Sequence, residues 1–160
     1  MKKKKESLTI NRHFIFIEAP IEKVSPEVVL WGDAPWWPKA SPMQFTRIRG
    51  EKIDIGTQYE LKVKKPFGSR WQAEMEELIP DKLVKRTFSK GMVAGYEVIK
   101  MSERSNGTRV DYEMHYTIRG FMNKALWNWV YRKQHDDNLK SILQALKQYV
   151  LKEQERIEER

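Results

Sequence analysis

Residues 108–119 read TRVDYEMHYTIR, and the fold class follows from this stretch. Apolar side chains occupy every second position, at Val110, Tyr112, Met114, Tyr116 and Ile118. Successive side chains of a strand point to opposite faces of a sheet. One face of this strand is therefore predicted to be buried and the other to face water, which is typical of an antiparallel sheet. Residues 105–108 are predicted to form a two-residue hairpin turn before it, because Asn-Gly accepts positive φ angles.

The same alternation recurs earlier in the middle of the chain. Its inward positions are Thr57, Tyr59, Leu61 and Val63 in one segment and Trp71, Ala73 and Met75 in the next. Clusters of Pro, Gly, Asp and Ser predict further turns at residues 66–69, 79–82 and 91–95. Four or more short antiparallel strands are therefore expected.

A further strand is predicted at residues 8–18, where apolar residues gather before Ala19-Pro20. Pro20 suits the start of a helix. The segment from Pro20 to Lys39 contains three further prolines, so we expect short, kinked helices there. Ser25 is predicted to cap one of them, with Pro26 at its first helical position.

After Gly120 the apolar residues recur at helical spacing nearly to the end of the chain. The pattern predicts an amphipathic helix over residues 122–157. Its buried stripe is expected to contain Leu126, Trp129, Val130, Leu139, Ile142, Leu143, Leu146 and Val150. At 1.5 Å per residue such a helix measures about 50 Å, which exceeds the sheet that it covers. The layout is α+β, with the helix packed on one face of the sheet.

The length of 160 residues fits one domain with one core, and the sequence contains no internal repeat. We expect a disordered basic tail at residues 1–6 and a folded domain at residues 7–152. Residues 153–160 are expected to form a charged helix end or a frayed tail. The chain has no Cys, which excludes disulfides, thiolate zinc sites and thiol nucleophiles.

The net charge is +8, and Lys2–Lys5 carry four of these charges. Subtracting four from eight leaves about +4 for the rest, so no DNA partner is expected without a localised basic stripe. The four lysines are expected to make at most a weak contact with an anionic surface. The apolar run at residues 14–17 is too short for a signal peptide or a membrane span. The protein is predicted to be soluble and cytoplasmic.

Several motifs resemble, in their order and spacing, the START-like, polyketide cyclase/dehydrase and lipid-transport superfamily (SRPBCC), which includes the birch-pollen-allergen-like proteins. They are Ile17-Glu18-Ala19-Pro20, Glu22-Lys23-Val24, Trp36-Trp37-Pro38, Gly50, Gly56, Trp71-Gln72-Ala73-Glu74, Asn106-Gly107-Thr108-Arg109-Val110 and the long closing helix. The resemblance covers about residues 7–152. It implies a helix-grip fold, in which a curved antiparallel sheet wraps around the C-terminal helix, with two short helices after the first strand. Pro26 departs from the pattern, because many relatives run their first helix without a break there.

The resemblance also implies an elongated cavity between the sheet and the helix. The side chains expected to line it are Tyr59, Leu61, Trp71, Met75, Tyr112, Met114 and Tyr116 from strands, with Trp127 or Trp129, Val130 and His135 from the helix. A mainly apolar lining with a few polar tips suits a small-molecule pocket. The alternative for each aromatic residue is that it only packs the core. Base stacking is not favoured, because the tryptophans are not interleaved with Lys or Arg on one predicted face.

Three charged or titratable residues have two interpretations each. His135 lies four residues before Leu139 and so on or beside the buried stripe, as a hydrogen-bonded core residue or as a catalyst. The sequence leaves open whether Arg86 and Glu77 face the inner or the outer side of the sheet. An inward Arg86 would bind a carboxylate or phosphate of a ligand, whereas an outward one would be surface charge.

Catalytic and metal motifs are missing from the sequence. His13, His115 and His135 have no zinc-site spacing, and His115 is expected on the outward face of its strand. There is no P-loop, nucleophile elbow or dinucleotide fingerprint. We therefore predict no metal and no cofactor, and nothing in the sequence requires an enzyme.

Three functions follow from these patterns. The first is binding or carrying of a hydrophobic small molecule, such as a lipid, isoprenoid, quinone or polyketide-like ring, by a monomer or weak dimer. The second is a cyclase or aromatase that uses Tyr112, Tyr116 or His135 as acids and bases. The third is a protein- or RNA-interaction module that uses Lys2–Lys5 and the charged helix end.

Overall fold

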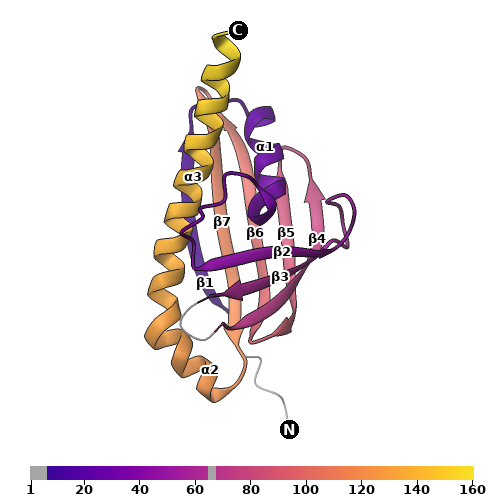
Figure 1. Cartoon of the computed structure of the whole chain (residues 1–160), viewed down its shortest axis with the longest axis vertical. Helices are drawn as coiled ribbons and strands as arrows, with labels where there is room; N and C mark the ends of the chain where they lie inside the picture. Colours follow the sequence, from indigo (N-terminus) through magenta and orange to yellow (C-terminus); the bar gives the residue numbers. More distant parts are fainter. Residues whose placement is uncertain (1–6, 65–67) are drawn as a thin grey trace.

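The computed structural model describes residues 7–64 and 68–160 and shows a sheet that curls around a long C-terminal helix (Figure 1). The strands are β1 (Thr9–Ile17), β2 (Met43–Arg49), β3 (Gln58–Val63), β4 (Arg70–Ile79), β5 (Leu83–Gly91), β6 (Val93–Arg104) and β7 (Gly107–Ile118). They pair antiparallel in the order β1-β7-β6-β5-β4-β3-β2. The predicted α+β helix-grip architecture is confirmed. The tail at residues 1–6 and part of the turn predicted at 66–69 lie outside the described residues.

The alternation in β7 is confirmed along its whole length. Every second side chain from Thr108 to Ile118 is buried, and those between are only partly covered. β3 and the first half of β4 follow the same pattern. Figure 1 shows β2 and β3 running across the direction of β6 and β7, so the buried side chains point into a concave space.

The hairpin between β6 and β7 is confirmed, but its turn is shifted by one residue from the prediction. Arg104 pairs with Gly107, so Ser105 and Asn106 connect the strands, and neither residue has a positive φ. The prediction that Asn106-Gly107 forms the centre of the turn is therefore wrong. Gly107 is needed for another reason, because a side chain there would collide with the backbone carbonyl of Ile17 in β1.

The segment after β1 forms one α-helix, α1 (Ile21–Leu30), followed directly by a single 3-10 turn, η1 (Trp31–Asp33). The prediction that Ser25 caps a helix at Pro26 is wrong, because α1 begins after Pro20 and contains both residues. Ser25 is buried, and its Oγ accepts a hydrogen bond of 2.8 Å from the backbone N–H of Asp81. It therefore ties α1 to the turn between β4 and β5.

The C-terminal helix has three parts, α2 (Phe121–Leu126), a π-helical turn η2 (Trp127–Tyr131) and α3 (Arg132–Glu158). The predicted stripe is correct in α3 but wrong at Trp129 and Val130, which are 91% and 39% exposed. Trp127 and Tyr131 are buried in their place. In an α-helix, residues four positions apart differ by about 40° in their direction around the helix axis, so such a series rotates away from the core. The π turn has more residues per turn and cancels this rotation. It keeps Trp127, Tyr131 and His135 on the inward face.

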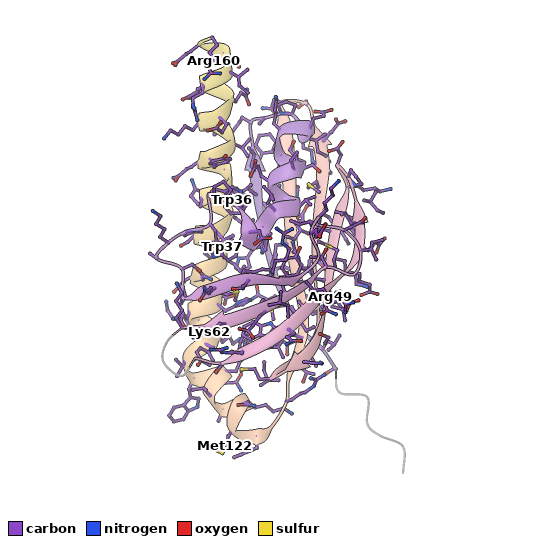
Figure 2. All side chains as sticks on the ribbon, turned by 45° about the vertical axis from the view of Figure 1, so that its right-hand side comes forward. Trp36, Trp37, Arg49, Lys62, Met122 and Arg160 are labelled. Carbon is purple, nitrogen blue, oxygen red and sulfur yellow. The ribbon has the colours of Figure 1, made fainter. Side chains whose placement is uncertain are left out.

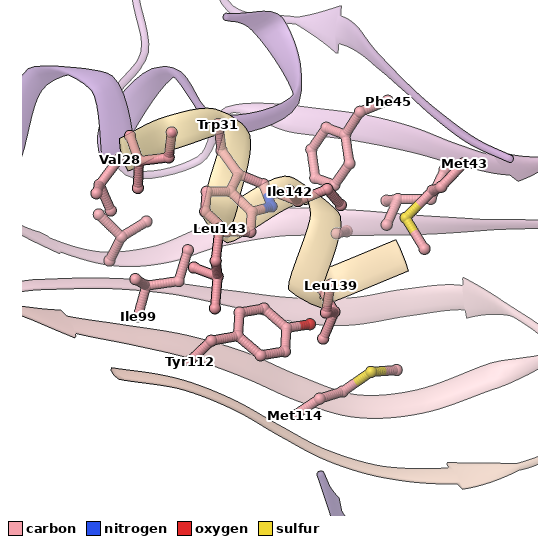
Figure 3. Close-up of a cluster of buried hydrophobic side chains, with 14 of the residues drawn as sticks. Val28, Trp31, Met43, Phe45, Ile99, Tyr112, Met114, Leu139, Ile142 and Leu143 are labelled. Carbon is pink, nitrogen blue, oxygen red and sulfur yellow. The ribbon is translucent and has the colours of Figure 1, made fainter. Parts of the chain in front are cut away.

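The core lies between the concave face of the sheet and the stripe of α3 (Figure 3). Its side chains include Val28, Trp31, Met43, Phe45, Ile99, Tyr112, Met114, Leu139, Ile142 and Leu143. α1 and η1 close one end, where Trp31 stacks on Tyr112 with ring centroids 5.9 Å apart. α3 extends beyond the sheet at its C-terminal end (Figure 1), and Figure 2 shows Arg160 and Met122 at opposite ends of the molecule.

Gly95 offers a test of how closely β6 and β7 approach each other. Its φ is +126°, and a Cβ there would collide with the backbone carbonyl of His115 in β7. We expect Gly95→Ala to lower the free energy of unfolding by about 3 kcal/mol, as the sum of backbone strain and a clash that cannot relax. Urea denaturation at neutral pH measures this change.

Gly56→Ala is the matched control, because Gly56 also has a positive φ, of +88°, but has open space around its Cβ position. It should lower the free energy of unfolding by the backbone strain alone, about 1 kcal/mol. Equal losses for the two variants would contradict the close approach of the strands.

Candidate functional site

The predicted lining residues are buried in the interior, except Val130 and Trp129, the alternative to Trp127. The buried members are Tyr59, Leu61, Trp71, Met75, Arg86, Tyr112, Met114, Tyr116, Trp127 and His135. Val130 lies outside the interior, so its predicted inward orientation is wrong. The cause is the register of the π turn, which turns Val130 and Trp129 toward the surface.

The interior contains two small adjoining cavities of about 10 Å³ each. The inner cavity is bordered by Met43, Trp71, Glu97, Tyr112, His135 and Leu139, among others. The outer cavity is bordered by Pro42, Met43, Trp71, Gln134, His135 and Asn138, among others. Because Met43, Trp71 and His135 border both, the two cavities are neighbours. Each is roughly large enough for one water molecule.

A surface groove of about 590 Å³ continues this series outward. It runs between the loop before β2 and the start of α3, and it is bordered by Trp129, Val130 and Lys133, among others. The groove shares Pro42, Gln134 and Asn138 with the outer cavity. Groove, outer cavity and inner cavity therefore share walls in series from the surface to the core, and we call this series the route.

Polar atoms without a partner among the described residues line this route. They are the indole nitrogen of Trp71, both ring nitrogens of His135 and the amide nitrogen of Asn138. All three side chains border the outer cavity. The amide oxygen of Asn138 is engaged, since it accepts a 2.9 Å hydrogen bond from the hydroxyl of Ser41. An unpaired buried polar group costs about 1–3 kcal/mol, so these atoms are available to form hydrogen bonds with a molecule in the cavity.

His135 is uncharged at neutral pH. Burial lowers its pKa from 6.5 to about 4, against a smaller opposing effect of the Asp136 carboxylate and with a further lowering by His13. The neutral ring carries one N–H donor and one acceptor nitrogen. His135 can therefore donate one hydrogen bond to a guest and accept another.

A second group of buried polar side chains is paired within the protein, and only the Nε of Arg86 in this group has no partner among the described residues. Arg86 of β5 is fully buried and pairs with Glu97 of β6 at 3.2 Å, and the Tyr112 hydroxyl donates to the other carboxylate oxygen at 2.9 Å. Burial, followed by the Glu97 charge, raises the pKa of Tyr112 well above its ordinary value. Arg86 is thus inward, but its charge is balanced by Glu97. Glu77, the other residue of ambiguous register, is exposed.

Of the two other predicted hydroxyls, that of Tyr59 is buried without a partner among the described residues, and that of Tyr116 is engaged. Tyr116 accepts a 3.0 Å hydrogen bond from the indole N–H of Trp127. His115 lies on the outer face of the sheet, as predicted, where it stacks on Tyr96 and contacts Glu113 at 2.8 Å. Of the predicted polar site residues, Trp71 and His135 present unpaired atoms to the outer cavity.

Sequence reasoning missed Asn138, Glu97 and Met43. Asn138 was detectable, because it follows His135 by three residues and precedes the buried Leu139 on the same helix face. Glu97 was not detectable, because Glu97, Val98 and Ile99 are all buried and break the alternation of β6. Met43 lies at the start of β2, beside the loop that borders the groove.

Neither a metal site nor a membrane-crossing helix is found in the described part of the chain. Its His, Asp and Glu side chains nowhere gather as three or more possible metal ligands. Among residues 7–64 and 68–160, no helix combines the length and apolar composition needed to cross a membrane.

No family model and no curated protein matches the sequence. Solved structures do match. A protein from Thermus thermophilus is 20% identical, with a TM-score of 0.70 over 89% of this chain and 97% of that one. The Zhui aromatase/cyclase from a Streptomyces species is 12% identical, with a TM-score of 0.71 over 89% and 93%.

A norcoclaurine synthase point mutant from Thalictrum flavum, in complex with a transition-state analogue, is also similar. It is 14% identical, with a TM-score of 0.70 over 92% of this chain and 96% of that one. Likeness at such low identity concerns the course of the backbone. The chain therefore shares the fold of these structures, and it is the helix-grip fold that the sequence motifs predicted.

Proposed function

We propose that the protein binds a small, mainly apolar molecule between the sheet and the C-terminal helix. The observation that carries this proposal is the convergence of unpaired nitrogens of Trp71, His135 and Asn138 on the outer cavity. A guest in the groove lies beside these atoms, because the groove shares Pro42, Gln134 and Asn138 with the outer cavity. Its apolar body would contact Pro42, Trp129 and Val130.

The groove and the outer cavity differ in volume, so they would hold different parts of the guest. The groove, at about 590 Å³, has the size of a small-molecule site, whereas the outer cavity is about 10 Å³. A group larger than a water molecule must therefore widen the outer cavity. Met43 is suited to move, because its unbranched side chain has three rotatable bonds. The main body of the guest lies in the groove, and one polar end reaches inward.

The chemistry of the polar end follows from the unpaired atoms. Trp71 and Asn138 offer N–H donors, and neutral His135 offers a donor and an acceptor. No net charge faces the outer cavity from these three side chains. A neutral guest with carbonyl or hydroxyl oxygens fits this set best. Quinones and polyketide-like rings meet the requirement, whereas an isoprenoid hydrocarbon does not.

A pair of probes tests this preference. We expect 1,4-naphthoquinone to bind about tenfold more tightly than naphthalene, because only the quinone has oxygens that accept from the buried donors. Equilibrium dialysis measures both affinities, and the absence of Cys removes thiol addition to the quinone. His135→Phe should remove most of this preference.

His115→Phe is the matched control, since it makes the same substitution on the outer face of the sheet. It should leave both affinities unchanged. Equal affinities of the unaltered protein for the two probes would contradict the proposal. The proposal would also be contradicted if His135→Phe and His115→Phe had the same affinities for both probes, once denaturation shows that both variants are folded. Native mass spectrometry of the freshly purified chain would reveal a guest retained from the cell.

Acid–base catalysis on such a guest is the second candidate function, and the free nitrogens of His135 favour it. The hydroxyls of Tyr112 and Tyr116 are already hydrogen-bonded within the protein. If a cyclase or aromatase substrate is turned over, His135→Gln should lower kcat about 100-fold while Tyr116→Phe leaves it within a factor of two. The reverse order would assign the chemistry to Tyr116. Contacts of Lys2–Lys5 with protein or RNA lie outside the described residues and stay a prediction.

The buried position of His135 also predicts a pH dependence of stability. Its pKa is about 4 in the folded protein and about 6.5 in the unfolded chain, so the unfolded chain binds more protons between these values. Stability is therefore lost as the pH falls through this window. Between pH 7 and about pH 4.5, the loss from this residue should be about 2.5 kcal/mol.

Comparison with His135→Gln isolates this contribution, because the variant keeps His13 and His115. The unaltered protein should lose about 2.5 kcal/mol more than the variant over the same pH interval in urea denaturation. Equal losses would show that His135 is protonated in the folded protein at the lower pH.

A further inference from the structure

The end of the molecule formed by α2 and η2 exposes large apolar side chains. Phe121, Met122 and Trp129 are 87%, 83% and 91% exposed, and no residue of α2 is buried. Met122, Ala125 and Trp129 follow one another at intervals of three and four residues, so they lie along one side of the helix. We call Phe121, Met122, Ala125 and Trp129 the apolar tip. Figure 2 shows Met122 at the end of the molecule opposite Arg160.

The segment that carries the apolar tip is basic. Residues 119–135 contain no Asp or Glu and four basic residues, Arg119, Lys124, Arg132 and Lys133, all of which are exposed. The first acidic residues after it are Asp136 and Asp137, and Asp137 pairs with Lys133 at 2.7 Å. The net charge of the segment is therefore +4, from four basic and no acidic residues.

We propose that this end of the molecule docks on the surface of an anionic phospholipid membrane. Exposed Trp and Phe beside Lys and Arg are typical of helices that lie in the membrane interface. The apolar rings would enter the boundary of the headgroups, and exposed basic side chains of the segment, such as Arg132, would contact lipid phosphates. Charge complementarity therefore favours an anionic lipid surface over a second copy of this chain, whose matching segment is equally basic.

The position of the apolar tip relative to the groove gives docking a consequence. Trp129, Val130 and Lys133 border the groove, so the groove opens beside the docked surface. An apolar guest would then pass between the membrane and the groove without crossing water. Docking itself rests on the exposed side chains and their charge, and it stands or falls independently of the proposed guest.

Flotation of the full chain with vesicles tests the proposal. We expect binding to vesicles of phosphatidylcholine with about 30% phosphatidylserine, weak binding to phosphatidylcholine alone, and loss of binding at high salt. Trp129→Ala should weaken partition to the anionic vesicles about tenfold. The double variant Lys124→Glu and Arg132→Glu should weaken it at least as much.

Two controls separate the apolar tip from other parts of the chain. Ile157→Ala removes an exposed apolar side chain, 58% exposed, at the other end of the same helix and should leave partition unchanged. Lys2, Lys3, Lys4 and Lys5 are replaced by serine in the second control. In that background, Trp129→Ala should still weaken partition to the anionic vesicles about tenfold. The naphthoquinone affinity of Trp129→Ala, measured without vesicles, shows separately whether the guest site is intact.

Three results would overturn the proposal. One is equal partition to anionic and neutral vesicles, and another is unchanged partition of Trp129→Ala. The third is a dimer in analytical ultracentrifugation that Trp129→Ala converts to a monomer, without vesicle binding by either protein. That outcome would assign the apolar tip to self-association.

Discussion

Packing of α3 into the concave face of the sheet is the interaction on which the rest of the structure depends. β7 presents an apolar side chain at every second position, and α3 meets this face with Leu139, Ile142, Leu143 and Leu146. Burial of apolar area stabilises at roughly 25 cal/mol per Å², so neither surface is stable in water without the other. The curl of β2 and β3 across the sheet follows from closing this core. The inner cavity lies within this core, and the outer cavity and the groove lie between it and the surface.

The polar groups within that core fall into two kinds. Arg86, Glu97 and Tyr112 pair with one another, and removing one charge would leave the other buried and unpaired. This group is therefore part of the structure. Trp71, His135 and Asn138 have atoms that no described residue satisfies, and these atoms share one cavity on the route to the surface. The gathering of several such atoms on one cavity is what distinguishes the candidate site, since the other unpaired atoms of the core, the Tyr59 hydroxyl and the Nε of Arg86, do not border that cavity.

The π turn couples the interior to the surface. By widening one turn, it places Trp127 and Tyr131 inward above His135, and it turns Trp129 and Val130 toward the groove. π turns occur often at functional sites. Here one local change of register supplies both a wall of the outer cavity and the most exposed side chain of the apolar tip. A regular α-helix through the same residues would present different side chains to both.

The sequence by itself determined the antiparallel sheet, the long helix and the mainly apolar interior, because alternation in strands and helical spacing in α3 are local patterns that burial enforces. Tertiary structure alone decided the inward position of Arg86 beside Glu97, since the two residues are eleven positions apart and meet only through the pairing of β5 with β6. It also decided that α1 starts at Ile21. Ser25 therefore lies within α1 and accepts a hydrogen bond from Asp81 in the turn between β4 and β5, instead of capping a helix. The site at Trp71, His135 and Asn138 joins a strand to a helix more than sixty residues away. No local pattern records which polar atoms such a junction leaves unpaired, because that depends on which side chains pack around them.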